Sequence, residues 1–389
     1  HRPRTRVIAG RLQLPVVRPP PPPPPPARGR RGGGARRGGV GGGGGCAGGG
    51  AGGGGGGAGA GSGGGGRGVV EEGAGSGGRG ASGAGARRGG GEGKDIEVEK
   101  PDSHNIVEGK RRVQAMRKRK RIVQMGSQHR STERLQTALA YIREGHLGKC
   151  LVAKAWESAR QGSIGRPADG DPPKEVDYDM WLGSAPKRPF NRNRFHGSWR
   201  WFFDYGSGDL GNDGVHRLDM AFAGLSAALE TEGNKPLRMP RKIRGTGGKW
   251  YFDDDQEWPD TMQITYDYPG TPPRTLTYEM RIWTPYNYLG ESEGAAVFGD
   301  KGYILLGNRG WRAFSNGGKL VKEQVGDGNA TPHVQDFINS IKTRKRPYCD
   351  LETVGHPASV LCHAGNIATQ LGRTITFDKI GRASRRGSV

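Results

Sequence analysis

The stretch of residues 199–219 combines aromatic, glycine and ionisable side chains more densely than any other part of this chain. Four of its residues are glycines, which permit backbone turns that other residues disfavour, and an apolar helical pattern follows them. On one helix, Asn212 and His216 stand four residues apart and Asp219 three further on, so their side chains would share one face. A histidine that titrates near neutrality, beside a polar neighbour that orients its ring, can transfer protons. The alternative is a histidine that caps the helix or packs in the core.

Residues 1–93 form a low-complexity leader that lacks the side chains needed for a core. Of the 73 glycines in the chain, 39 precede residue 95, and the first aromatic residue is Tyr141. The formal net charge of +22 is also concentrated here, because residues 1–94 hold 15 basic and 3 acidic side chains. We expect this Gly-, Pro- and Arg-rich leader to be disordered. Its Arg-Gly-Gly repeats resemble RNA-binding tails, but they lack aromatic residues that stack on bases and predict no specific nucleic-acid binding.

The pattern changes where the leader ends. Residues 95–99 alternate between apolar and polar as a strand does, Ser103 is a candidate helix N-cap, and a sparse helical stripe follows. A second strand at 122–125 precedes a helix whose apolar residues keep helical spacing until Gly145. Strand, helix, strand and helix in this order are typical of a parallel α/β sheet. Residues 94–148 are therefore predicted to be the remnant of a Rossmann-like domain.

A second domain is predicted for residues 149–378. A strand at 150–157 leads through a Pro- and Asp-rich loop to the stretch 199–219, and several strand-like runs follow between Gly, Pro and Asp turns. Two helices close the domain, and the Arg- and Ser-rich tail at 379–389 is expected to be disordered. The predicted fold class is therefore α/β, with a partial Rossmann-like parallel unit followed by an α/β domain that contains a large antiparallel sheet.

Cysteine spacing and hydropathy exclude several classes of protein. The four cysteines are too irregularly spaced for a disulfide framework, so free thiols are expected. His356, Cys362 and His363 lie close in sequence but match no zinc pattern, and we predict no metal site. No apolar run of about 18 residues predicts a membrane span. Because the chain begins with His1, no targeting signal can be read, and the cytoplasm is the default expectation.

Several motifs in a fixed order resemble one family. They are the tripeptide E-K-P at 99–101, a helix and a strand after it, and a glycine-rich loop that ends in His216. The stretches V-Q-M-G-S-Q-H-R-S at 123–131 and W-L-G-S-A-P at 181–186 add to the match. From 94 to 378 the sequence resembles the Gfo/Idh/MocA family of NAD(P)-dependent sugar oxidoreductases, named from glucose-fructose oxidoreductase and inositol dehydrogenase.

The resemblance implies a Rossmann domain that binds NAD or NADP, and an α/β domain whose open antiparallel sheet makes homo-oligomer contacts. It implies that Lys100 hydrogen-bonds the reacting hydroxyl and that His216 takes the hydroxyl proton. An ammonium group beside a developing alkoxide stabilises it electrostatically. The alternative for Lys100 is an ordinary exposed lysine. The predicted site residues are Lys100 and His216 as catalytic, Asn212, Asp213, Tyr205, Trp201 and Arg130 as substrate-binding, and Glu99, Lys100, Pro101 and Gln128 as cofactor-binding. Trp199 and Phe203 are expected to support the same pocket, because aromatic rings offer stacking surfaces to sugars.

Two departures from the family pattern bear on activity. Asn212 stands where many relatives carry an aspartate, and an amide can orient a substrate but cannot share its proton. The first half of the Rossmann domain, with its Gly-x-Gly-x-x-Gly turn, is not recognisable. The leading hypothesis is hydride transfer between a nicotinamide cofactor and a sugar, cyclitol or related polyol. The alternatives are a non-catalytic truncated or frame-shifted family member that binds no cofactor, and RNA binding through the leader.

Overall fold

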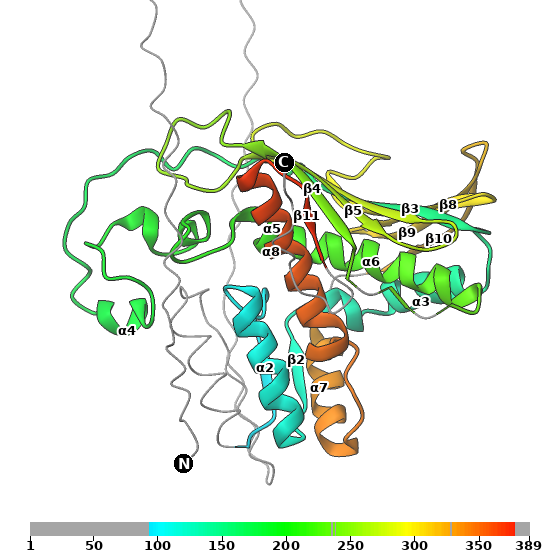
Figure 1. Cartoon of the computed structure of the whole chain (residues 1–389), viewed down its shortest axis with the longest axis horizontal. Helices are drawn as coiled ribbons and strands as arrows, with labels where there is room; N and C mark the ends of the chain where they lie inside the picture. Colours follow the sequence, from blue (N-terminus) through cyan, green and yellow to red (C-terminus); the bar gives the residue numbers. More distant parts are fainter. Residues whose placement is uncertain (1–92, 235, 238, 327–328, 378–389) are drawn as a thin grey trace, which may run out of the picture. The chain divides into compact units, whose positions relative to one another are not determined.

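The computed structural model describes residues 93–377 apart from 235, 238, 327 and 328 (Figure 1). The chain divides into two units, residues 1–63 and 64–389, and every described residue belongs to the second. The expectations for the leader up to residue 92 and for the tail at 379–389 fall outside the described residues. Within the described part, no helix combines the length and apolar character needed to span a membrane.

A two-stranded parallel sheet begins the described part and confirms the predicted Rossmann-like unit. Strand β1 (Ile96–Val98) pairs in parallel with β2 (Val123–Met125), and helix α2 (Ile106–Arg119) connects them. The side chain of Asn105 accepts a hydrogen bond from a backbone N–H in the first turn of α2. Asn105 is therefore the N-cap, and the expectation that Ser103 would cap this helix is wrong. Basic side chains occupy the last turn, where cations complement the helix dipole.

Nine strands form a second sheet in the order β10-β9-β8-β7-β3-β6-β5-β4-β11. Their bounds are β3 (Cys150–Glu157), β4 (Lys242–Gly248), β5 (Thr261–Tyr268), β6 (Arg274–Arg281), β7 (Glu293–Gly299), β8 (Gly302–Gly307), β9 (Gly310–Ser315), β10 (Leu320–Val325) and β11 (Ile375–Thr376). All neighbours run antiparallel except β3 and β6, which are parallel. This confirms a large, mostly antiparallel sheet. The strands β4, β9, β10 and β11 were not predicted. Strand β4 holds three glycines and β10 is exposed along most of its length, so neither has the usual pattern of a strand.

Two helices cover one face of the large sheet (Figure 1). Helix α6 (Gly214–Thr231) packs on β3 and β7, and α3 (Glu133–Arg143) packs on α6. Because α6 lies between the sheet, α3 and α8, nearly all of its side chains are buried. The other helical segments are η1 (Gln128–Ser131), α4 (Tyr178–Leu182), η2 (Arg192–Arg194), η3 (Ser198–Trp201), α5 (Gly208–Asn212), α7 (Thr331–Thr343), η4 (Leu351–Gly355) and α8 (His356–Leu371).

Helix α8 joins the parallel unit to the large sheet. It contacts α2 on one side and β4 and α6 on the other. Apolar side chains of both sheets and of these helices form a single buried core. The helix ends at Gly372, which adopts the left-handed conformation that favours glycine at this position. The carboxyl edge of the β1–β2 pair is thereby held against the second domain.

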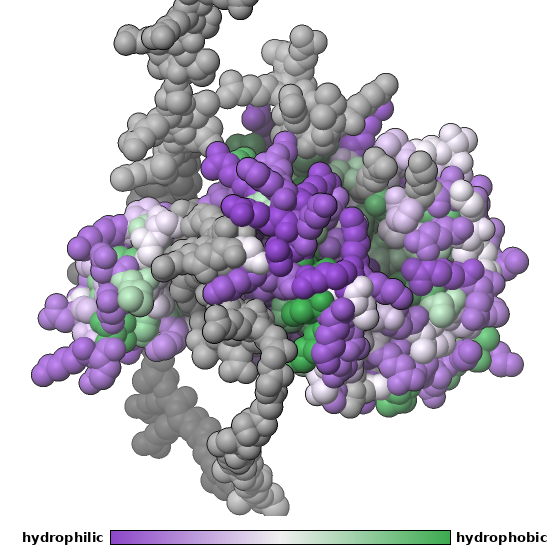
Figure 2. Space-filling view, turned by 90° about the horizontal axis from the view of Figure 1, so that it is seen from below, coloured by the Kyte–Doolittle hydropathy of each residue, from purple (hydrophilic) through white to green (hydrophobic). Residues whose placement is uncertain are grey.

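The loop between β3 and α5 extends to one side of the large sheet in Figure 1 and carries α4. This loop packs around a small apolar cluster formed by Leu182, Phe202 and Tyr205. Seen from below, the described surface is mostly hydrophilic, with small hydrophobic patches between the polar side chains (Figure 2).

Close packing of α6 on the sheet requires a glycine at position 224. A Cβ atom added there would lie 2.6 Å from Val297 Cγ2. Gly224→Ala is therefore expected to lower the free energy of unfolding by about 1–3 kcal/mol, measured by chemical denaturation. The double variant Gly224→Ala, Val297→Ala should recover part of this loss relative to Val297→Ala alone. Gly162→Ala is the control, because nothing lies within 4 Å of its added Cβ. Equal losses in both glycine variants would contradict this packing argument.

Candidate active site

Lys100 follows β1 and reaches the second domain. Its Nζ donates hydrogen bonds to the backbone oxygen of Asn212 at 2.6 Å and to Asn212 Oδ1 at 2.9 Å. The peptide bond between Lys100 and Pro101 is cis. Burial lowers the pKa of Lys100 below its ordinary value, while nearby carboxylates, Asp213 first among them, act in the opposite direction. Lys100 is thus a partly buried cation held at a defined position, not an ordinary exposed lysine.

Asn212 and His216 lie on two consecutive helices, and the expectation that one helix would carry them is wrong. Helix α5 ends at Asn212 and α6 begins at Gly214, with Asp213 between them. The backbone N–H of His216 donates to the oxygen of Asp213 at 3.1 Å. In a continuous α-helix that N–H would bond to the oxygen of Asn212. The break therefore leaves the Asn212 oxygen available to Lys100.

His216 lies in the first turn of α6 and is shielded from water at its Nδ1. This atom is buried and has no hydrogen-bond partner among the described residues. Burial lowers the pKa of His216 well below its ordinary value, and the charge of Lys100 acts in the same direction. His216 is consequently a neutral imidazole at neutral pH, with a ring nitrogen able to accept a proton.

His129, which was not predicted to be a site residue, packs against His216. The two rings meet edge to face with their centroids 5.3 Å apart. His129 Nδ1 lies 2.7 Å from Arg134 Nη2, and its Nε2 lies 3.5 Å from Arg217 Nη1. Burial, with the charges of Arg217 and Arg134, lowers the pKa of His129 to about 3. His129 is therefore neutral and fixes the ring of His216 by contact. The sequence signal that could have identified His129 as a site residue was its position in the 123–131 stretch, which resembles the family.

Arg130 and Asp219 form a buried ion pair with each other. Arg130 donates from Nε to Asp219 Oδ2 at 2.7 Å and from Nη2 to Asp219 Oδ1 at 2.6 Å, and Ser127 also bonds to Asp219. This pairing fastens η1 to α6. It uses the carboxylate of Asp219, which was expected to share a helix face with His216 for proton chemistry. It also occupies two nitrogens of Arg130, whose predicted role in substrate binding stays a prediction.

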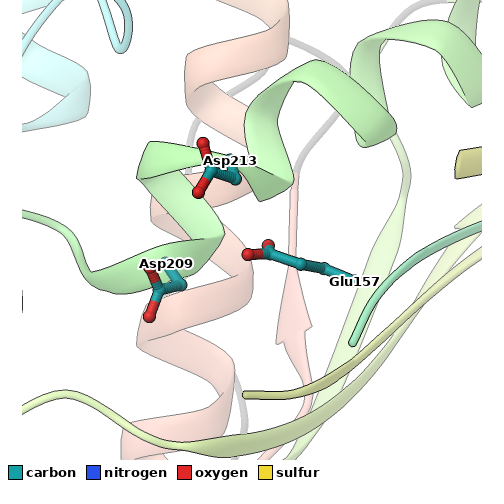
Figure 3. Close-up of side chains that lie close together, drawn as sticks. All are labelled: Glu157, Asp209 and Asp213. Atoms are coloured by element: carbon teal, nitrogen blue, oxygen red, sulfur yellow. The ribbon is translucent and has the colours of Figure 1, made fainter. Parts of the chain in front are cut away.

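Two buried acids that were not predicted lie beside Asp213. They are Glu157 at the end of β3 and Asp209 in α5, and Figure 3 shows all three carboxyl groups together. Burial raises the pKa of Glu157 well above its ordinary value, and the charges of Asp209 and Asp213 act in the same direction. No sequence motif indicated Glu157, because the end of an apolar strand alone does not reveal which helix lies over it.

The predicted aromatic residues divide between two environments. Trp201 is buried, and its Nε1 donates to Asp209 Oδ2 at 2.6 Å, which attaches it to the carboxyl group cluster. Tyr205 is buried in the apolar cluster of the β3–α5 loop, and Trp199 packs against the same cluster. Phe203 is partly exposed. Among these four, Trp201 therefore has the most direct connection to the site, and a substrate role for all of them stays a prediction.

Glu99 and Gln128 meet at the carboxyl edge of the β1–β2 pair. A Cβ atom added to Gly126 would lie 3.1 Å from Glu99 Oε2 and 3.5 Å from Gln128 Nε2. Pro101 lies against α5, with its Cγ 3.7 Å from a Cβ added to Gly211. Ligands of open α/β sheets bind at this edge of parallel strands. The structure thus brings the predicted cofactor residues to the expected edge.

The group formed by His356, Cys362 and His363 is used in packing. His356 Nδ1 lies 3.5 Å from Asp102 Oδ1, and His363 Nε2 lies 2.9 Å from the backbone oxygen of Ser103. Cys362 is buried, which raises the pKa of its thiol. These contacts attach α8 to the loop that follows Lys100.

Comparison with known proteins agrees with this architecture. Residues 155–240 match the sequence model of the oxidoreductase family C-terminal alpha/beta domain of Gfo/Idh/MocA proteins. None of the curated proteins compared with the chain matches it in sequence.

Several solved structures share the fold. One is an aldose-aldose oxidoreductase from Caulobacter crescentus complexed with glycerol, with 16% identity, 75% of each chain covered and a TM-score of 0.53. Another is the WlbA dehydrogenase from Bordetella pertussis in complex with NADH and UDP-GlcNAcA, with 15% identity, 77% of each chain covered and a TM-score of 0.52. An oxidoreductase domain protein from Kribbella flavida has 14% identity, a TM-score of 0.56, and coverage of 77% of this chain and 78% of its own.

The domain match and the shared α/β fold both point to the oxidoreductase class of proteins. Residues 155–240 thus match the C-terminal domain of Gfo/Idh/MocA oxidoreductases, and the described part shares its fold with solved oxidoreductases, in agreement with the resemblance found in the sequence.

Proposed function

We propose that the chain transfers a hydride between a nicotinamide cofactor and a sugar, cyclitol or related polyol. The contact of Lys100 with Asn212 carries this proposal, because it brings a cation from the parallel unit to the turn that precedes His216. A structure of similar fold is a dehydrogenase in complex with NADH and a sugar nucleotide acid, which supports the choice of cofactor and substrate class.

The two catalytic residues would have complementary roles. Oxidation of an alcohol removes a proton from the hydroxyl group, and the neutral His216 can accept it at a ring nitrogen. The ammonium group of Lys100 stabilises the negative charge that develops on the hydroxyl oxygen. That ammonium group donates hydrogen bonds to the two oxygens of Asn212. A substrate hydroxyl would share this coordination.

The carboxyl edge of the parallel unit fits the nicotinamide end of the cofactor. Gly126 has no side chain, so the side chains of Glu99 and Gln128 approach its backbone closely, and a larger residue would displace them. Glu99, Pro101 and Gln128 would hold the ring beside Lys100, and the bound cofactor would supply the hydride acceptor. In such domains a phosphate-binding turn precedes this part of the sheet, and no such turn is recognisable in this sequence.

On the substrate side, Asn212 and Asp213 are the residues best placed to orient hydroxyl groups. Asn212 Nδ2 donates to Asp213 Oδ2 at 3.1 Å, so the two side chains form one polar surface beside Lys100. The homo-oligomer contact through the large sheet stays a prediction. A small apolar cluster of Trp156, Ala296 and Leu305, with partly buried aromatic residues around it, lies in the strands concerned.

Cofactor binding is tested by titrating NADH and NADPH into the full chain. We expect quenching or a blue shift of the dihydronicotinamide fluorescence, because an enclosed site removes the ring from water. The variant Gly126→Val should weaken binding about tenfold or more, since its side chain would fill the space between Glu99 and Gln128. Gly162→Val is the matched control in an open loop. Unchanged fluorescence for the wild type with both nucleotides would favour the non-catalytic alternative.

A further inference from the structure

Three carboxyl groups lie together at the break between α5 and α6. One oxygen from each of Glu157, Asp209 and Asp213 lies within 4.8 Å of the others. Figure 3 shows the side chain of Glu157 extending from the end of β3 toward the two aspartates. Three negative charges at this spacing repel one another strongly in a buried site.

Glu157 is as fully enclosed as Asp209 and is the least satisfied member of this cluster. The residue is 0% exposed. Its Oε2 accepts a hydrogen bond from the Tyr278 hydroxyl at 3.2 Å, while its Oε1 is buried and has no hydrogen-bond partner among the described residues. A buried carboxylate with one unpaired oxygen is costly, whereas a protonated carboxyl group can donate to a neighbouring carboxylate.

The charged and titratable groups around Glu157 come from every element packed on it. They are Lys100 after β1, Arg200 in η3, Asp209 in α5, Asp213 at the helix break, Arg217 in α6, Tyr278 in β6 and Glu293 in β7. Arg200 and Arg217 are already engaged with Asp209 and Glu293. These cations therefore do not pair directly with Glu157.

A proton suits this cluster better than a metal cation. Both oxygens of Asp209 already accept hydrogen bonds, Oδ2 from Trp201 Nε1 at 2.6 Å and Oδ1 from Arg200 Nε at 3.3 Å. A divalent cation would need several of the same lone pairs and would lie close to Arg200.

We propose that Glu157 is a positioning residue that holds one proton for the three carboxyl groups, and so limits the negative charge beside Lys100 and the turn before His216. The effect of this proton on the charge around Lys100 bears on catalysis and so rests on the proposed function. The presence of the proton on Glu157 does not depend on that function. Burial raises the pKa of Glu157, and of Asp209 in the same cluster, in agreement with this geometry.

Protonation of Glu157 has a distinct effect on stability. A carboxyl group whose pKa is raised on folding binds more protons in the folded than in the unfolded chain, so stability falls as pH rises above the unfolded pKa of about 4.3. Glu157→Gln keeps the shape of the neutral form and removes this loss. We expect its Tm relative to the wild type to increase from pH 5 to pH 8 by about 3 °C or more.

Glu279→Gln is the matched control, because it replaces a glutamate whose pKa is lowered. Glu279 Oε2 accepts a hydrogen bond from Lys154 at 2.7 Å, and this contact and those with its other neighbours hold its pKa below the ordinary value despite partial burial. A group of this kind stabilises the fold above its unfolded pKa and loses that contribution as pH falls. The Gln variant should therefore have a Tm deficit that stays constant from pH 8 to pH 5 and shrinks only as pH falls below the unfolded pKa of about 4.3.

Two outcomes would overturn the proposal. The first is a difference in Tm between Glu157→Gln and the wild type that stays constant from pH 5 to pH 8, which would mean that Glu157 is ionised throughout. The second is a rise in the Tm of the wild type, but not of the variant, on addition of Mg²⁺ or Mn²⁺, which would assign the cluster to a cation. Infrared spectra provide the direct readout, because the carbonyl band of a protonated carboxyl group should be present in the wild type and missing in Glu157→Gln. These measurements need no cofactor, so failure of the hydride-transfer proposal leaves them interpretable.

Discussion

Replacing Lys100 by methionine is expected to lower turnover by about 10²- to 10³-fold, the loss typical when one donor to a developing negative charge is removed. Methionine has a similar length but no charge, so it fills the space without stabilising the alkoxide. The variant should fold, because it removes a cation whose burial lowers its pKa and which is therefore held at some cost. Turnover is measured on a panel of sugars and polyols with NAD and NADP.

The Lys100 variant has a second expected effect that a merely structural role would not produce. The charge of Lys100 helps to lower the pKa of His216. Without it, the acidic limb of the rate profile should move to higher pH. Lys242→Met, on the exposed edge of β4, is the control and should retain both turnover and pH profile. Wild-type turnover in Lys100→Met would remove Lys100 from the catalytic role.

Replacing His216 by asparagine is expected to lower turnover by about 10²- to 10⁴-fold, the usual contribution of a general base. In the wild type, the rate should fall as pH decreases through the pKa of His216, because the protonated ring cannot accept the hydroxyl proton. Since this pKa lies well below its ordinary value, the acidic limb should lie below pH 6.5. The asparagine variant should lack this limb and show a low rate that does not change over the same range.

Two comparisons make the histidine experiment decisive. His146→Asn changes an exposed histidine paired with Glu144 and should leave the profile unaltered. Asn212→Ala should lower turnover less than His216→Asn, because Asn212 can only orient its partners. If His216→Asn keeps both the normal turnover and the acidic limb, the base lies elsewhere. Asp213 is then the next candidate, because Asp219 is bound to Arg130.

The sequence by itself determined the class of fold, and it led to the prediction of Lys100 and His216 as catalytic residues. Alternation and helical spacing are local properties of side-chain burial, so they placed β1, β2 and β3 within one residue of their observed bounds and the end of α3 within two. The order of the motifs around Lys100 and His216 was sufficient to indicate the family. Both residues stand at element ends, where short motifs are informative.

Only the tertiary structure decided which groups surround these residues. The break at Asp213, which frees the Asn212 oxygen for Lys100, lies where α5 packs on α8, and it leaves no distinct local pattern in the sequence. Asp219 has helical spacing from His216, but Arg130 from η1 captures its carboxylate, a contact 89 residues away in the chain. Glu157 ends a strand whose sequence is ordinary. Only the fold brings Asp209 of α5 and Asp213 at the helix break beside it. Electrostatic environment depends on distances between distant segments, and local sequence does not contain those distances.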